Sequence, residues 1–201
     1  MNIDQVVLEV AKGLVNCFEK EHSIVFPEYH NNGNEEYRIS EQESKILFSN
    51  EFIKNGVRFA VEVPTKSKHQ QKGESERSGR FDLAVYKEDT YDFDWVIELK
   101  SGNPKPYDFE KDFEKMVLSN SKCIWFHTLK NANERTFESV LGKINRGIHF
   151  EISNFEGKHI WKLIIVVLEK KELYSLDISL EKGKYDEIQS IDQFTKIERL
   201  S

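Results

Sequence analysis

Periodic apolar positions predict two helices in the first quarter of the chain. Between residues 3 and 19, apolar side chains recur at the spacing of one helical face, and Asn2 is able to cap this helix. Ser40 and Glu43 form a capping box, which predicts a second helix that ends near Gly56. Residues 22–37 hold a short apolar run followed by a polar segment, which we interpret as a loop.

Alternating apolar positions then predict three strands. Residues 57–63 read VRFAVEV, a strand that Pro64 is expected to end. Residues 80–86 and 95–100 are rich in aliphatic and aromatic side chains, and the polar segment between them suits a turn. These two runs therefore predict a β-hairpin.

The rest of the chain continues with helices and strands in succession. The pattern predicts a helix over 109–117, a central strand over 123–126, a helix over 133–146, two strands over 161–168 and 172–178, and one short helix in the charged tail from 181. We expect a single α/β domain over residues 1–201. Residues 1–38 would form an N-terminal helical extension, 39–130 the core, and 131–201 a C-terminal helix and β-hairpin.

The predicted hairpin carries two carboxylates and an amine. Successive side chains of a strand point to opposite faces, so Glu98 and Lys100 share one face. Asp82 lies near the start of the preceding strand, and hairpin folding brings it towards the end of the second. Adjacent carboxylates repel each other, and a divalent cation removes that conflict. Oxygen ligands favour Mg²⁺ or Mn²⁺ over zinc, and the waters that such ions keep can act as nucleophiles, which suits phosphodiester hydrolysis. Lys100 could orient that water or offset negative charge in the transition state.

The Glu-x-Lys spacing is weak evidence by itself. It occurs four times, beginning at Glu43, Glu98, Glu156 and Glu169. Only the Glu98 copy both ends an apolar strand-like run and has an Asp on a preceding strand. The structural alternative is a solvated hairpin with a surface ion pair, since 32% of the residues are charged and such pairs are nearly neutral in energy.

The order of these elements resembles the PD-(D/E)xK nuclease superfamily: a helix with Glu, a strand, a strand with Asp, a strand with Glu-x-Lys, a helix and a strand. The resemblance covers residues 39–130 and implies a restriction-endonuclease-like core, a central mixed β-sheet flanked by helices in α-β-β-β-α-β order. It implies that Asp82 and Glu98 bind the metal, that Lys100 assists the attacking water, and that Glu41 completes the site. Phe81 replaces the Pro of the family name, a position that is loosely kept in the superfamily.

Three glutamates are candidates for completing the metal site. Glu41 shares a helix face with Lys45 and could reach inward, although carboxylates in a first helical turn are favoured by the helix dipole alone. The capping box already explains Glu43. Glu62, on the first predicted strand, could join the site or face solvent beside a neighbouring strand.

The polar segment 65–79 is the best candidate for gripping phosphates, although a charge run is usually a solvated loop. Its basic residues are Lys66, Lys68, Lys72 and Arg77, and Arg80 follows directly after the segment. On the following helix, Lys111 and Lys115 either face the scissile strand or pair with Asp108, Glu110 and Glu114. His127, at a strand end, is a candidate general acid.

Composition narrows the functional classes. A net charge of −6 argues against a general nucleic-acid coat protein but not against a nuclease, which needs only a local basic face. Cys17 and Cys123 lie in apolar contexts without metal-ligand spacing and are expected to be buried thiols in a reducing compartment. With no visible signal peptide or membrane span, we expect a cytoplasmic protein with no membrane partner.

Two functional hypotheses follow. The first is a Mg²⁺-dependent nuclease acting on DNA, with RNA less expected because most members of the resembled superfamily cut DNA. A homodimer or a partner subunit is compatible with it. The second is a catalytically silent, nuclease-like module for nucleic-acid binding or complex assembly.

Overall fold

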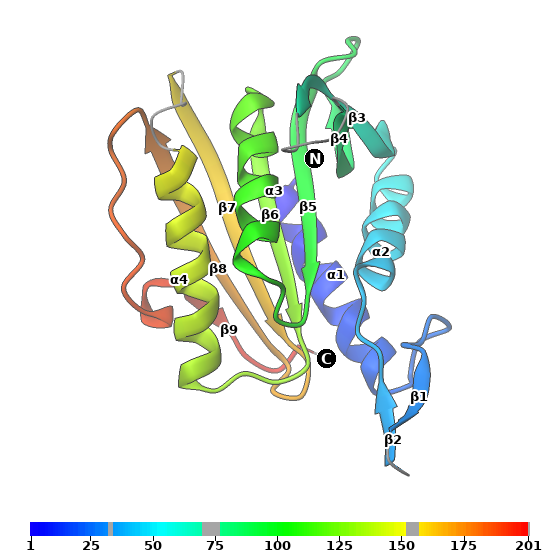
Figure 1. The fold of residues 1–201 in the computed structure, drawn as a ribbon. Coiled ribbons are helices and arrows are strands. Elements are labelled where there is room, and N and C mark those ends of the chain that lie inside the picture. The colour runs from blue at the N-terminus through cyan, green and yellow to red at the C-terminus, as the bar shows by residue number, and fades with distance from the viewer. Residues whose placement is uncertain (32–33, 70–76, 152–156, 201) are drawn as a thin grey trace.

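The computed structural model describes residues 1–31, 34–69, 77–151 and 157–200 (Figure 1). Within them the chain forms an α/β fold, as predicted. The helices are α1 (Ile3–Phe18), α2 (Glu41–Lys54), α3 (Pro106–Leu118) and α4 (Glu134–Glu151), with a short 3₁₀ helix, η2 (Ile191–Gln193). The main sheet contains β3 (Phe59–His69), β4 (Arg77–Tyr86), β5 (Phe93–Ser101), β6 (Lys122–Leu129), β7 (Lys158–Val167), β8 (Glu172–Glu181) and β9 (Thr195–Ile197), while β1 (Glu28–Asn31) and β2 (Asn34–Tyr37) form a separate hairpin.

The main sheet is mixed, and its seven strands follow sequence order from β3 to β9. Strands β3, β4 and β5 run antiparallel, β5, β6 and β7 run parallel, and β8 and β9 return antiparallel. Helices α3 and α4 connect the parallel strands, as such crossovers require. Strand β6 lies at the centre and is buried from Cys123 to Leu129, which confirms the prediction of a central strand.

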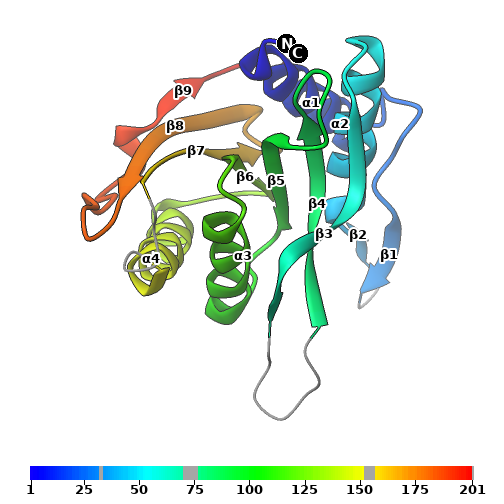
Figure 2. The same ribbon diagram turned by 90° about the horizontal axis from the view of Figure 1, so that it is seen from above.

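Helices cover both faces of the sheet (Figure 2). The face under α1 and α2 holds one apolar core, and the face under α3 and α4 holds another. Side chains of β5 alternate between the two cores: Ile97 and Leu99 belong to the first core and Val96 to the second. The same alternation directs Glu98 and Lys100 towards α3.

Capping side chains fix the predicted helix starts. The Asn2 side chain accepts hydrogen bonds from the backbone N–H groups of Asp4 and Gln5 at the start of α1. Ser40 accepts from the N–H of Gln42 and donates its hydroxyl to Glu43 Oε2 at 2.7 Å, so Glu43 serves the start of α2.

The prediction that Pro64 ends the first strand is wrong. Strand β3 continues to His69, with a register irregularity between Pro64 and Lys68. Because β3 is an edge strand, a residue without an N–H is tolerated there. Much of the predicted loop over 65–79 is therefore a long β3–β4 hairpin, and Figure 2 shows it extending beyond the other strands. The β1–β2 hairpin also lies where a loop was predicted, because its strands are polar and lack apolar alternation.

Both thiols are free and buried, as predicted. Burial raises the pKa of Cys17 to about 11 and raises that of Cys123 further, so both remain protonated at neutral pH. Among the helices described, none is both long enough and apolar enough to cross a membrane.

Candidate active site

Asp82 lies where β4 departs from regular alternation. Phe81 and Leu83 are two residues apart, yet Phe81 packs in the core under α3 and α4 and Leu83 in the opposite core. Directly across on β3, Glu62 has a φ of 52°, a left-handed conformation that is uncommon for residues other than glycine. Asp82 Oδ2 accepts a hydrogen bond from the N–H of Leu99 at 2.9 Å. The carboxylate is therefore fixed to the backbone of β5.

Glu98 is buried, with 1% of its surface exposed, and faces α3. Its Oε1 lies 2.7 Å from Lys115 Nζ, which also lies 2.8 Å from Asp112 Oδ1 and donates to the carbonyl of Arg80 at 3.0 Å. The ammonium group of Lys115 is thus surrounded by three oxygens, of which the Arg80 carbonyl accepts a hydrogen bond and the two carboxylates form ion pairs. Burial, followed by the negative charges of Asp112 and Asp82, raises the pKa of Glu98 well above its usual value despite the attraction of Lys115.

Lys100 extends from β5 between α3 and the start of α2. Its Nζ lies 2.7 Å from Asp112 Oδ2 and 3.5 Å from Glu41 Oε1. Burial lowers the pKa of Lys100, but the charges of Asp112 and Glu41 outweigh burial, so the net shift is upward and the group stays charged. Asp112 therefore bridges two lysines through its two oxygens.

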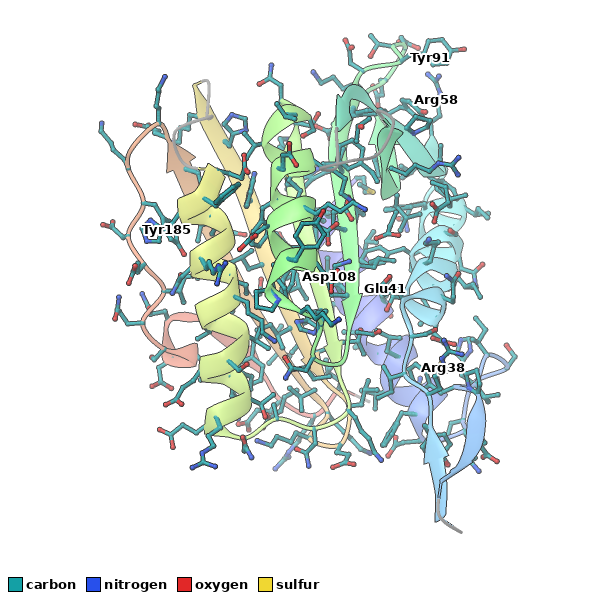
Figure 3. All side chains as sticks on the ribbon, in the orientation of Figure 1. Arg38, Glu41, Arg58, Tyr91, Asp108 and Tyr185 are labelled. Carbon is teal, nitrogen blue, oxygen red and sulfur yellow. The ribbon has the colours of Figure 1, made fainter. Side chains whose placement is uncertain are left out.

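Two side chains of α2 complete the cluster. Glu41, labelled in Figure 3, lies between α2 and β5, and its pKa is raised by burial and by the nearby charges of Asp82 and Asp112, against the effect of Lys100. One helical turn later, Lys45 Nζ lies 3.1 Å from Asp82 Oδ1 and also donates to Glu62. The four predicted catalytic residues thus belong to one network of charges.

The network contains more carboxylates than lysines. It contains the carboxylates of Glu41, Glu62, Asp82, Glu98 and Asp112 and the ammonium groups of Lys45, Lys100 and Lys115. The five carboxylates thus outnumber the three ammonium groups, and a divalent cation would offset the repulsion between them.

The donor chemistry of the cluster fits a hard divalent cation. All of its anionic groups are carboxylates, which are the ligands that Mg²⁺ and Mn²⁺ prefer. In the positions that the side chains adopt, the described residues include no group of three or more His, Cys, Asp or Glu side chains placed to hold a metal ion. Instead, lysine ammonium groups lie against carboxylate oxygens, so a metal would have to replace at least one of these contacts.

Sequence reasoning missed Lys45 and Asp112 as members of this network, and it missed the contacts of Lys115. Both alternatives for Lys115, facing a substrate strand or pairing with Asp108, Glu110 and Glu114, are wrong, because its side chain is buried against Glu98 and Asp112. One signal was present: Asp112 falls three residues after Phe109 and four before Met116, within the buried stripe of α3.

The predicted phosphate-gripping residues lie on or near the β3–β4 hairpin. Lys66 and Lys68 are on β3 and Arg77 is on β4, but only their backbone is described, and Lys72 lies outside the described residues. Arg80 is exposed on β4. The backbone carbonyl of Arg80 accepts the hydrogen bond from Lys115.

His127 lies in the interior among aromatic side chains. Its ring is fully buried, packs against Phe109 and Trp125, and its Nε2 lies 2.6 Å from the carbonyl oxygen of Gly102. Burial lowers its pKa to about 4, so the ring is neutral at pH 7. A neutral, fully buried ring is poorly suited to the predicted role of general acid.

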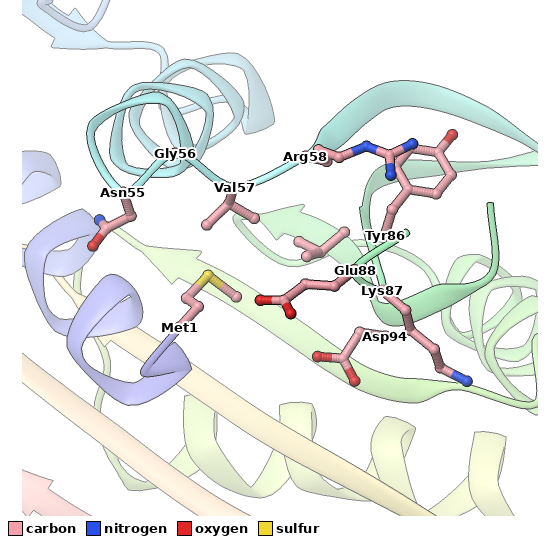
Figure 4. A pocket seen from close by; sticks show the side chains of 10 residues that line it. Met1, Asn55, Gly56, Val57, Arg58, Tyr86, Lys87, Glu88 and Asp94 are labelled. Atoms are coloured by element: carbon pink, nitrogen blue, oxygen red, sulfur yellow. The ribbon is translucent and has the colours of Figure 1, made fainter. Parts of the chain in front are cut away.

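A separate pocket of about 470 Å³ lies beside the β4–β5 turn (Figure 4). Residues from the end of α2, the start of β3 and the β4–β5 connection line it, including Arg58, Tyr86 and Glu88. The Arg58 guanidinium lies over the rings of Tyr86 and Tyr91. Figure 3 shows Arg58 and Tyr91 well apart from Glu41, and the charged network does not line this pocket.

Comparison of the chain with protein-family models, with curated proteins and with solved structures gives no match. The functional inference therefore depends on the geometry and charge of the network.

Proposed function

We propose that the chain is a metal-dependent nuclease that hydrolyses phosphodiester bonds in DNA, with Mg²⁺ or Mn²⁺ held by Asp82, Glu98 and Glu41. The observation that carries this proposal is a partly buried cluster made only of carboxylates and lysines, in which five carboxylates lie beside three lysines. The succession α2–β3–β4–β5–α3–β6 supports a restriction-endonuclease-like core. Glu41 on α2, Asp82 on β4 and Glu98 on β5 each lie on the element that the resemblance implies.

The protein's own residues would orient the reaction. Leu99 fixes one oxygen of Asp82, and Lys115 fixes one oxygen of Glu98, so both carboxylates are held in place before a ligand binds. A bound divalent cation would polarise the phosphate and lower the pKa of a water molecule. Lys100 remains an ammonium beside Asp112 and Glu41, where it can orient the attacking water or offset the charge that develops on the phosphate.

DNA as the substrate rests on the resemblance and on the basic positions of the β3–β4 hairpin. Lys66, Lys68 and Arg77 lie on strands that lead away from the site, in a chain with a net charge of −6. A local basic arm would provide the phosphate contacts that the acidic remainder of the molecule lacks.

The direct test compares cleavage of linear duplex DNA, circular duplex DNA, single-stranded DNA and RNA with Mg²⁺ or Mn²⁺. Wild type would be compared with Glu98→Gln, which keeps the shape of the side chain but removes its charge. Glu169→Gln is the matched control, because Glu169 also begins a Glu-x-Lys sequence after an apolar strand but is exposed in the turn after β7, which β6 separates from β5. We expect wild type and Glu169→Gln to cut DNA and Glu98→Gln to be inactive.

One observation favours the alternative of a catalytically silent module. Each of the three lysines in the network already contacts two carboxylates, as a purely structural network would require. Calorimetry with Mn²⁺ separates the two functions. Binding that is lost in Asp82→Asn supports the nuclease, whereas an absence of Mn²⁺ binding and of cleavage by wild type would favour the silent module.

A further inference from the structure

The two oxygens of the Asp82 carboxylate have different partners. Oδ2 accepts from the backbone N–H of Leu99 and is committed to holding the side chain in place. Oδ1 lies 3.1 Å from Lys45 Nζ. A cation that approached Asp82 at Oδ1 would therefore meet the ammonium of Lys45.

Lys45 differs from the other two lysines of the network. Lys100 and Lys115 both contact the buried carboxylate of Asp112, whereas the carboxylate contacts described for Lys45 are with Asp82 and Glu62. Lys115 also donates to a backbone carbonyl. Lys100 and Lys115 are thus tied to a buried carboxylate. Lys45 is as little exposed as Lys100, at 12% of the side chain, but its second partner, Glu62, is half exposed.

The second partner of Lys45 allows it to leave Asp82 without becoming an unpaired charge. The Glu62 side chain is 49% exposed, so an ammonium that remains beside it is close to solvent. The left-handed backbone of Glu62 lies opposite Asp82, an uncommon conformation that persists where surrounding contacts impose it. This geometry keeps Glu62 within reach of Lys45.

We propose that Lys45 is a further catalytic residue that competes with the divalent cation for Asp82 and, once displaced, contacts the scissile phosphate. The inference rests on the proposed nuclease function and adds a residue to that site. Lys45 follows Glu41 by one turn of α2, and its ammonium needs to move only from one carboxylate of the site towards an incoming phosphate. A lysine suits this role as a compact charge on a flexible chain.

The test measures Mn²⁺ affinity by calorimetry, without substrate, for wild type, Lys45→Met and Lys45→Arg. Loss of the competing charge should make Mn²⁺ binding to Lys45→Met at least about fivefold tighter, a coupling of ordinary size. Lys45→Arg keeps the charge and should bind Mn²⁺ as wild type does. Lys122→Met is the matched control, because Lys122 also contacts an aspartate, Asp94, at 3.1 Å but lies outside the network, and its Mn²⁺ affinity should not change.

DNA cleavage at saturating Mn²⁺ supplies the second readout. We expect Lys45→Met to cut about a hundredfold more slowly than wild type, because it lacks a positive group at the phosphate. Tighter metal binding combined with slower cleavage is a signature that a purely structural lysine would not give. If Lys45→Met fails to fold in a thermal melt, Lys45→Gln gives the same comparison with a polar side chain.

The outcomes distinguish the role of Lys45 from the proposed nuclease function. The role of Lys45 is overturned if wild type binds Mn²⁺ and a folded Lys45→Met variant binds it equally or more weakly. That result would not contradict the proposed nuclease function. Tighter binding with undiminished cleavage would overturn the contact with phosphate. Wild type that neither binds Mn²⁺ nor cleaves would overturn both.

Discussion

Lys115 Nζ and Glu98 Oε1 lie 2.7 Å apart in the interior, with side chains that are 6% and 1% exposed. Removing two charges from water is costly, and their mutual attraction only partly offsets that cost. An apolar pair would fill the same space without desolvating any charge. We therefore interpret the pair as a device that holds Glu98 in one orientation beside Asp82, rather than as a source of stability.

Replacing Lys115 with Met should destabilise the fold strongly. The substitution leaves Glu98 and Asp112 buried without this cation, and breaking a buried pair in this way costs about 3–5 kcal/mol. Urea unfolding at pH 7 measures the loss. Lys122→Met removes a surface pair with Asp94 and should change the unfolding free energy by less than about 1 kcal/mol. Equal losses in the two variants would contradict the prediction.

The contact between Asp112 and Lys100 predicts coupled effects on activity. Asp112→Asn keeps the side-chain shape but removes the charge that lies 2.7 Å from the Lys100 ammonium. If Asp112 acts by orienting Lys100, cleavage by Lys100→Met should be slowed little further by adding Asp112→Asn. The measurement is a double-mutant cycle on the rate of DNA cleavage at saturating Mn²⁺. Additive losses in variants with unchanged melting temperatures would show that Asp112 does not act through Lys100.

The parts of the fold that could be predicted are those with strong local periodicity. The β4–β5 hairpin and the four α-helices follow from apolar spacing and from capping residues such as Asn2 and Ser40. The continuation of β3 beyond Pro64 could not be read locally, because it depends on β3 being an edge strand. Which strand lies at an edge is decided by the assembled sheet.

The candidate site could likewise be predicted only in part. Asp82, Glu98 and Lys100 could be identified because all three lie on one hairpin, which brings Asp82 beside the end of β5. Lys45 and Asp112 lie on separate helices, and they reach the site only because α2 and α3 pack beside β4 and β5. A sequence pattern gives the face of a helix that is buried, but not the neighbour against which that face packs.

Protonation of His127 should destabilise the protein in acid. Its pKa falls from about 6.5 in the unfolded chain to about 4 in the fold, so the folded state favours the neutral ring. The resulting stabilisation is fully present above pH 6.5 and is lost as the pH falls towards 4, to a total of about 3 kcal/mol. Urea unfolding between pH 7 and pH 4 should therefore show wild type losing about this much more stability than His127→Gln. Parallel pH profiles for the two proteins would contradict the prediction.

The crossing of α3 and α4 requires a glycine at one position. A Cβ atom built on Gly147 would lie 2.2 Å from Cδ2 of Phe113, a fully buried ring of α3. Gly147→Ala should therefore cost about 1–3 kcal/mol, because one of the two packed helices must shift. Gly142→Ala is the control on the same helix, since nothing lies within 4 Å of its added methyl group. There the lower flexibility of alanine in the unfolded chain should raise stability by about 0.5–1 kcal/mol. Thermal and urea unfolding of the two variants should thus give shifts of opposite sign, and a stabilised Gly147→Ala would mean that α3 and α4 are not in contact at Phe113.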